Sequence, residues 1–354
     1  MECPLEWPEP VVPVQSLADA AVIPDRYVKP PSERPGDASK DASVDMIPIV
    51  DLGGLTGGAA EREATMREIS GACKEWGFFQ VVNHGVSPEL MRRAREVWRE
   101  FFHLPPEEKQ VFANSPNTFE GYGSRLGIQK GASLDWGDYF FLHLRPESIK
   151  NQDKWPALPA SLRKITEAYG TEVVKLCGVL MQVLSITLGL DESFLQKAFG
   201  EEEAGACMRV NYYPKCPQPD LTLGISSHSD PGGFTILLPD ERVQGLQVRK
   251  GDAWVTVQSV PHAFIVNLGD QIQVLSNAIY KSVEHRVFVN AAEARISIAL
   301  FYNPKGDLLV GPAPETVTPD RPPLYKPMTF DKYRLFIRKK GLCGKSQVES
   351  LIAM

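Results

Sequence analysis

Two histidines and an aspartate occur in an order that suits a metal centre. The run "SSHSDPGGFTILL" carries His228 and Asp230, and "VEHRVFVN" carries His285. Two imidazoles and one carboxylate are the ligand set of non-haem iron(II) sites that leave coordination positions open for oxygen chemistry. Arg295 follows ten residues after His285, with Ser297 two positions further on. A fixed guanidinium at that place could hold a second, carboxylate-bearing cofactor.

The strands that would carry these residues place polar side chains on a shared face. Side chains alternate between the two faces of a strand. In "MRVNYYP" this puts Arg209, Asn211 and Tyr213 together, and in "RISIALFY" it puts Arg295 and Ser297 together. The intervening positions of the second run are isoleucine and leucine. The sequence therefore predicts a polar pocket inside a β-barrel.

The residue composition and the hydrophobic pattern change several times along the chain. Eight prolines occur within the first 35 residues, which is typical of an extended, weakly structured lead-in. From residue 205, short Val-, Ile-, Phe- and Tyr-rich runs alternate with turns, as in an antiparallel sandwich or barrel. We expect five segments: a lead-in (1–45), an N-terminal α/β part (46–155), a long helical support (156–204), a β-rich core (205–310) and a C-terminal helical segment (311–354).

The bulk composition excludes several classes of function. The 354 residues are 43% hydrophobic and 23% charged, an ordinary globular balance. The net charge of −6, without a basic tract, argues against nucleic acid as a partner. The six cysteines are scattered and include no CxxC pair, which favours free thiols in a reducing compartment. With no signal peptide and no apolar run expected to span a membrane, we predict a cytoplasmic protein, with the nucleus as an alternative.

Four motifs together resemble one enzyme family. NYYP, HxDPGG, GDxxxxLSNxxYKSVxHR and RxS, spread within residues 46–340, are similar to those of the plant iron(II)/2-oxoglutarate-dependent dioxygenases. That family includes flavonol synthases, anthocyanidin synthases and jasmonate-oxidising enzymes. The resemblance implies an α+β fold: a double-stranded β-helix (jelly-roll) core with flanking helices and a smaller N-terminal α/β part.

The resemblance also implies the cofactors and their ligands. Iron(II) would be held by His228, Asp230 and His285, with O2 at an open position and ascorbate as the reductant. The 2-oxoglutarate would be bound by four residues that all match the family pattern: Arg295, Ser297, Tyr213 and Asn211. Oxidative decarboxylation of 2-oxoglutarate to succinate and carbon dioxide would then drive attack on a C–H bond of the substrate.

One cation is not used by this chemistry. Arg209 shares a strand face with Asn211 and Tyr213, and a buried guanidinium without an anion is costly. Because Arg295 already serves 2-oxoglutarate, we expect Arg209 to bind a substrate carboxylate. Two further arginines, on one face of the helix "DKYRLFIRKK", would complete the clamp, and two aromatic residues would form apolar walls; these are Arg334, Arg338, Phe141 and Phe301. A structural ion pair of Arg209, or a solvated face for the helix, is the competing interpretation.

Segments outside the iron core point to a substrate. "EGYGSRLGIQKGASLDWGDYFFLHL" and "PLYKPMTFDKYRLFIRKKG" resemble the jasmonate-induced oxygenases, which implies hydroxylation of jasmonic acid to 12-hydroxyjasmonate and so catabolism of a plant hormone precursor in defence. Four alternatives stay open. They are a flavonoid-type dioxygenase, an oxidase that uses no 2-oxoglutarate, a zinc hydrolase and a non-catalytic small-molecule binder. The sequence does not predict an oligomeric state.

Overall fold

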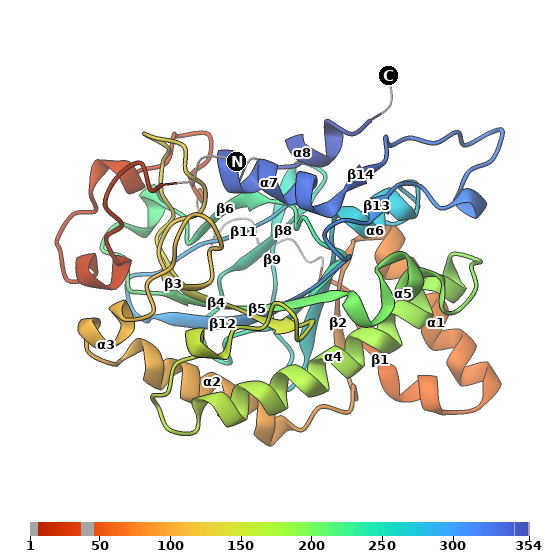
Figure 1. Ribbon diagram of the computed structural model, residues 1–354, viewed down its shortest axis with the longest axis horizontal. Helices are drawn as coiled ribbons and strands as arrows, with labels where there is room; N and C mark the ends of the chain where they lie inside the picture. The colour runs from red at the N-terminus through yellow and green to blue at the C-terminus, as the bar shows by residue number, and fades with distance from the viewer. Residues whose placement is uncertain (1–5, 37–45, 343, 353–354) are drawn as a thin grey trace.

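Two β-sheets build the centre of the molecule. The structure, a computed structural model, describes residues 6–36, 46–342 and 344–352. The eight-stranded major sheet has the order β1-β2-β10-β7-β12-β5-β4-β3, and the four-stranded minor sheet has the order β6-β11-β8-β9. In Figure 1 the major sheet lies between the minor sheet and helices α2 and α4. These two layers form the jelly-roll core that the sequence predicted.

The strands of the major sheet are β1 (Ile49–Asp51), β2 (Phe78–Val82), β3 (Gly121–Gly123), β4 (Asp138–Arg145), β5 (Gly205–Tyr213), β7 (Phe234–Leu238), β10 (Phe264–Leu268) and β12 (Arg295–Asn303). Those of the minor sheet are β6 (Ile225–His228), β8 (Leu246–Lys250), β9 (Ala253–Thr256) and β11 (His285–Val287). A small hairpin pairs β13 (Leu309–Val310) with β14 (Met328–Thr329). The helices are α1 (Ala59–Glu75), α2 (Pro88–Phe102), α3 (Pro106–Gln110), α4 (Leu162–Thr187), α5 (Phe194–Ala198), α6 (Asp270–Leu275), α7 (Phe330–Lys340) and α8 (Ser346–Glu349).

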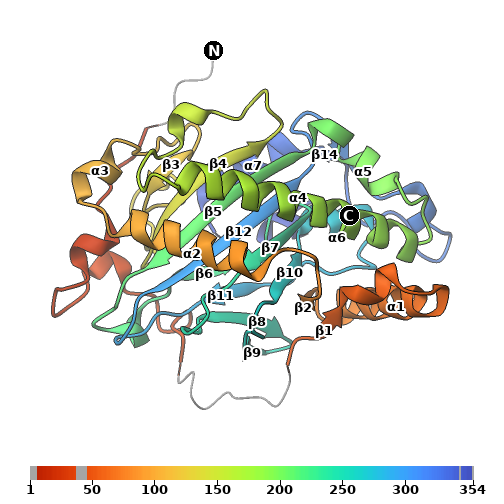
Figure 2. The ribbon, with the colours of Figure 1, turned by 90° about the horizontal axis from the view of Figure 1, so that it is seen from below.

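Helix α4 covers the outer face of the major sheet, together with α2 (Figure 2). Its buried residues recur every three or four positions, as in Tyr169, Val173, Leu176 and Leu180. That spacing gives the helix one broad apolar stripe. The stripe belongs to the same core cluster as the isoleucines and leucine of β12 that alternate with Arg295 and Ser297. The apolar face of β12 thus packs on the helices, and its polar face is left for the interior between the sheets.

The same helix is long and apolar enough to cross a membrane, judged by length and composition alone. The expectation that no uninterrupted apolar run approaches the length of a membrane span still holds, because Glu172 and Lys175 interrupt this helix. Half of its most apolar stretch is buried inside the fold. The core helix of a globular protein has the same character, because its stripe packs on a sheet and not on lipid.

The N-terminal α/β part does not form a sheet of its own. Strands β1 and β2 extend one edge of the major sheet, where β2 pairs antiparallel with β10. Strands β3 and β4 extend the other edge, where β4 pairs antiparallel with β5. Residues from 46–155 and from 205–310 therefore share one continuous sheet, and β4 brings side chains of the N-terminal part to the interior.

The proline-rich lead-in is more ordered than the sequence suggested. Its described residues 6–36 include two short 3-10 helices, Val14–Leu17 and Asp25–Tyr27. Val14 and Tyr27 are each at most 2% exposed. The backbone amides of Val14 and Gln15 donate to the buried carboxylate of Asp138, at 2.7 and 2.9 Å. Proline limits helix and strand formation, but it does not prevent this packing.

We expect two neighbouring positions on α4 to differ sharply in their contribution to stability. Leu180 is 1% exposed against the sheet, whereas Val179 is 41% exposed. Leu180→Ala should lower the free energy of unfolding by about 2–5 kcal/mol, because a buried cavity is left behind. Val179→Ala should change it by less than about 0.5 kcal/mol. Urea unfolding of both variants measures the difference, and equal effects would contradict the packing of α4 described above.

Candidate metal centre and active site

Three potential metal ligands converge where the minor sheet faces the interior. His228 at the end of β6 and His285 at the start of β11 are direct cross-strand partners, with ring centroids 4.2 Å apart. Asp230 follows β6 by two residues, and its Oδ1 lies 3.5 Å from Nε2 of His228 and 3.7 Å from Nε2 of His285. One ligand atom from each residue lies within 4.8 Å of the others. The three residues named from sequence spacing are thus brought together.

The hydrogen bonds of both imidazoles use Nδ1 and leave Nε2 free to bind a metal. Nδ1 of His228 lies 2.8 Å from the carbonyl oxygen of Ser226, and Nδ1 of His285 lies 3.2 Å from that of Val283. A carbonyl oxygen can only accept, so each Nδ1 carries the proton and each Nε2 keeps its lone pair. Burial, followed by repulsion from His228, lowers the pKa of His285 to about 4, so its ring is neutral near pH 7.

The carboxylate of Asp230 is fixed from its other side. Its Oδ2 accepts hydrogen bonds from Thr235 Oγ1 and from Asn267 Nδ2, the latter at 2.8 Å. Burial acts to raise the pKa of Asp230, but His285, His228 and Asn267 together bring that pKa well below its ordinary value. The charged carboxylate and the two neutral imidazoles fit a divalent, iron-type ion. Sequence reasoning missed Thr235 and Asn267, although Thr235 is a polar residue in an otherwise apolar strand.

Arg295 forms a separate cationic end of the interior. It is 4% exposed, it pairs with Tyr213 across β12 and β5, and its Cζ lies 5.2 Å from the centre of the tyrosine ring. A Cβ at Gly245 would lie 2.9 Å from Arg295 Cδ, so only glycine leaves room for this side chain. Burial raises the pKa of Tyr213, which keeps its hydroxyl protonated as a donor.

No carboxylate among the described residues forms an ion pair with Arg295, and its Nε has no hydrogen-bond partner there. Its Nη1 lies 3.5 Å from the Oγ of Ser297. A buried guanidinium in this state lacks the anion that would offset its desolvation. The site therefore fits the carboxylate of a bound small molecule. Asn211, which pairs with Ser297 across the strands, lies beside it.

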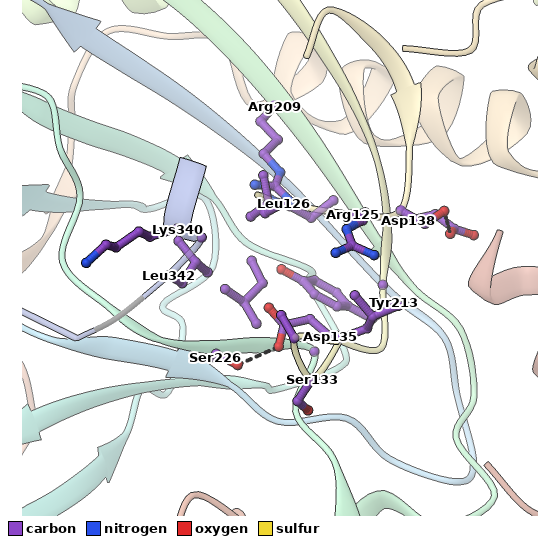
Figure 3. Close-up of a pocket in the computed structure, with 18 residues that line it drawn as sticks. Arg125, Leu126, Ser133, Asp135, Asp138, Arg209, Tyr213, Ser226, Lys340 and Leu342 are labelled. Carbon is purple, nitrogen blue, oxygen red and sulfur yellow. Dashed lines mark hydrogen bonds between the residues drawn. The ribbon is translucent and has the colours of Figure 1, made fainter. Parts of the chain in front are cut away.

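A pocket opens next to this end (Figure 3). Strand β5 contributes Arg209, Asn211 and Tyr213 to its wall, and the rest comes from residues 124–126, 132–135, 137–138, 224–226 and 340–342. The guanidinium of Arg209 stacks on the ring of Tyr139, with Cζ 4.0 Å from the ring centre. Its Nε is buried without a partner, and no described acid pairs with it. Arg209 is thus a second cation without a described acid partner, although its side chain is only partly buried.

The two aromatic residues predicted to contact the substrate lie on strands β4 and β12 of the major sheet. Phe141 pairs with Arg209 across β4 and β5, and Phe301 pairs with Thr235 across β12 and β7. Thr235 donates to Asp230, so Phe301 lies next to a residue that supports a predicted metal ligand. His143, two residues further along β4, lies on the same strand face as Phe141, and the centroids of the two rings are 5.2 Å apart.

The two helical arginines are not in the first pocket. Arg334 lines a neighbouring cavity with His143 and Cys207, which are the next cross-strand pair on the same sheet face as Phe141 and Arg209. It also forms an ion pair with Asp331 at 3.1 Å. Arg338 donates to the carbonyl oxygen of Asn117 at 3.1 Å. Burial, together with repulsion from Arg334, lowers the pKa of Arg338 to about 10. Both guanidinium groups also bear on the pKa of His143, so α7 brings them to the same end of the interior.

Comparisons with known proteins agree with this geometry. Residues 204–304 match the model of the 2OG-Fe(II) oxygenase superfamily, and residues 47–158 match that of the N-terminal region of non-haem dioxygenases in morphine synthesis. Jasmonate-induced oxygenase 2 of Arabidopsis thaliana is 60% identical over 98% of this chain and 95% of its own length. The flavonol synthase/flavanone 3-hydroxylase of the same plant is 40% identical over 90% of this chain and 95% of its own length.

Solved structures extend the comparison. The crystal structure of JOX2 in complex with 2OG, Fe and JA superimposes with a TM-score of 0.92 and 60% identity, covering 99% of this chain and all of that one. A rice dioxygenase for auxin oxidation gives a TM-score of 0.73 at 29% identity, over 87% of this chain and all of its own.

We expect the hydroxyl of Thr235 to strengthen metal binding. Thr235→Val keeps the shape of the side chain but removes one of the two donors to Asp230 Oδ2. Loss of such a partner should weaken the affinity for Mn(II), used as a redox-stable probe, by about 10- to 100-fold. Thr256→Val, on strand β9 of the minor sheet, serves as the control and should bind Mn(II) like the wild type. Unchanged affinity in the Thr235 variant would show that Asp230 needs no such support.

Proposed function

Since the chain belongs to the 2OG-Fe(II) oxygenase superfamily, we propose that this iron(II)- and 2-oxoglutarate-dependent dioxygenase hydroxylates jasmonic acid to 12-hydroxyjasmonate. The observation that supports this substrate is Arg209, a cation that lines the pocket and has no described acid partner. The iron chemistry does not need this cation. A relative of 60% identity has been solved with iron, 2OG and JA bound, which supports the same small carboxylic acid here.

The residues at the cationic end would bind the co-substrate. Arg295 offers a planar fork that suits the distant carboxylate of 2-oxoglutarate, with hydroxyl donors from Ser297 and Tyr213. His228, Asp230 and His285 would hold iron(II) on one side and leave the opposite side open. When bound, the iron supplies O2 activation, with one oxygen atom going to succinate as carbon dioxide leaves and the other to the substrate.

The remaining side chains would orient the substrate. Arg209 would bind its carboxylate, and Arg334 and Arg338 would add positive charge from α7. Phe141 and Phe301 would line the path of the hydrocarbon chain, and Phe301 stands next to the residue that supports Asp230. Holding a C–H bond in a fixed position near the centre, with water excluded, is the contribution that the protein makes to such chemistry.

We place this reaction in the cytoplasm, with the nucleus as an alternative. The four described cysteines, Cys73, Cys177, Cys207 and Cys216, are buried free thiols, which suits a reducing compartment.

The direct test is aerobic turnover of jasmonic acid with iron(II), ascorbate and 2-oxoglutarate. We expect a product heavier by one oxygen atom and one succinate for each product, measured by mass spectrometry. Product without succinate would indicate an oxidase that does not use 2-oxoglutarate. Turnover of a flavanone, but not of jasmonic acid, would contradict the proposed substrate.

A charge-removing variant tests the role of Arg209. Arg209→Met should lower kcat/KM for jasmonic acid by about 30-fold or more, because losing one partner of a buried charge pair costs at least about 2 kcal/mol. The affinity for 2-oxoglutarate should stay unchanged, since Arg295 is intact. Arg145→Met is the matched control, because Arg145 ends the neighbouring strand β4 and its side chain is 51% exposed. If Arg209→Met lost 2-oxoglutarate affinity instead, Arg209 would belong to the co-substrate site.

A further inference from the structure

The proline-rich lead-in reaches the wall of the active-site pocket through one buried lysine. Lys29 has a side chain that is 1% exposed, and its Nζ lies 2.8 Å from Oδ1 of Asp135, which is 20% exposed and lines the pocket. We propose that Lys29 is a positioning residue for the metal centre, acting on the predicted ligand His228 through Asp135 and Ser226. The inference rests on the proposed function only in that His228 binds the metal.

Each link of this relay is a contact in the structure. The hydroxyl of Ser226 donates to the same Oδ1 of Asp135, at 2.6 Å, as Figure 3 shows. The backbone carbonyl of Ser226 accepts the Nδ1 proton of His228, at 2.8 Å. Ser226 therefore joins the ion pair to the imidazole whose Nε2 faces the metal position. A displacement of Asp135 would shift Ser226, and with it the acceptor that sets the tautomer and orientation of His228.

The lead-in is anchored on both sides of this ion pair, so Lys29 cannot easily move away. The amide of Lys29 donates to the carbonyl of Leu221 at 2.8 Å, and the ring of Tyr27 packs edge-on against Trp136 at 5.3 Å. Asp138, three residues beyond Asp135, holds the first 3-10 helix of the lead-in. The run "DWGD" thus binds the lead-in through two carboxylates, those of Asp135 and Asp138.

Electrostatics explains why a lysine occupies this position. Asp135 lines the pocket together with Arg209, which has no described acid partner, and the negative charge of Asp135 acts to raise the pKa of Tyr213. An unpaired carboxylate there would attract Arg209 and would repel an anionic ligand. The ammonium of Lys29 neutralises it from behind the pocket wall. The buried ion pair therefore fixes Ser226 without adding net charge to the site.

The test compares Mn(II) affinity in four full-length variants, without turnover. Lys29→Met keeps the length of the side chain and removes the charge; we expect Mn(II) binding to weaken by roughly tenfold, as for other outer-sphere partners of a metal ligand. The double variant Lys29→Met/Asp135→Asn should recover to within about threefold of the wild type, because a neutral amide oxygen still accepts from Ser226 and no unpaired charge is left. Lys175→Met, which removes a 67% exposed lysine with an acid partner, should bind like the wild type.

The fourth variant keeps the inference testable if Lys29→Met does not fold. Ser226→Ala leaves the ion pair in place and cuts only the link to strand β6, so it should also weaken Mn(II) binding. Wild-type affinity in a folded Lys29→Met protein, or in Ser226→Ala, would overturn the relay, as would failure of the double variant to recover. Absence of Mn(II) binding in the wild type itself would instead count against the proposed metal centre.

Discussion

The buried carboxylate of Asp230 is the contact on which the site depends, because it joins the two sheets. Its Oδ2 is held by Thr235 of β7 and Asn267 of β10, both in the major sheet. Its Oδ1 faces the imidazoles of His228 and His285, which the minor sheet supplies. Burial of a charge is costly unless the charge is hydrogen-bonded or paired. The same contacts that make Asp230 tolerable therefore also set the geometry of the candidate metal centre.

The interior between the sheets departs from the usual pairing of buried charges. Arg295 and Arg209 project from neighbouring strands, and no described acid compensates either of them. Such cations cost stability in the empty protein. The apolar cluster of α2, α4 and the outer face of the major sheet offsets this cost. Binding of two anions should then stabilise the fold, because ligands that bind only the native state add to its stability.

Much of this arrangement could be predicted by the period of a strand. The alternation predicts that Arg209, Asn211 and Tyr213 share one face of β5 and that Arg295 and Ser297 share one face of β12. The structure adds the register, which pairs Tyr213 with Arg295, Asn211 with Ser297 and Arg209 with Ala299. The helix α4 follows from its three-to-four spacing in the same way. The lead-in was predicted less well, since proline content reports on local conformation and not on whether a distant surface will accept the segment.

The sequence by itself determined the chemistry of the site: a pair of histidines with an aspartate, an arginine and a serine at strand spacing, and one extra arginine on the same face. These are local properties, because side-chain alternation and ligand type need no knowledge of distant segments. Only the tertiary structure decided which other side chains support these site residues. Thr235 and Asn267 meet at Asp230, Lys29 reaches Asp135 across more than a hundred residues of chain, and Arg334 and Arg338 lie in and beside a second cavity. Such contacts depend on strand order and on packing between segments far apart in the chain, which no local period encodes.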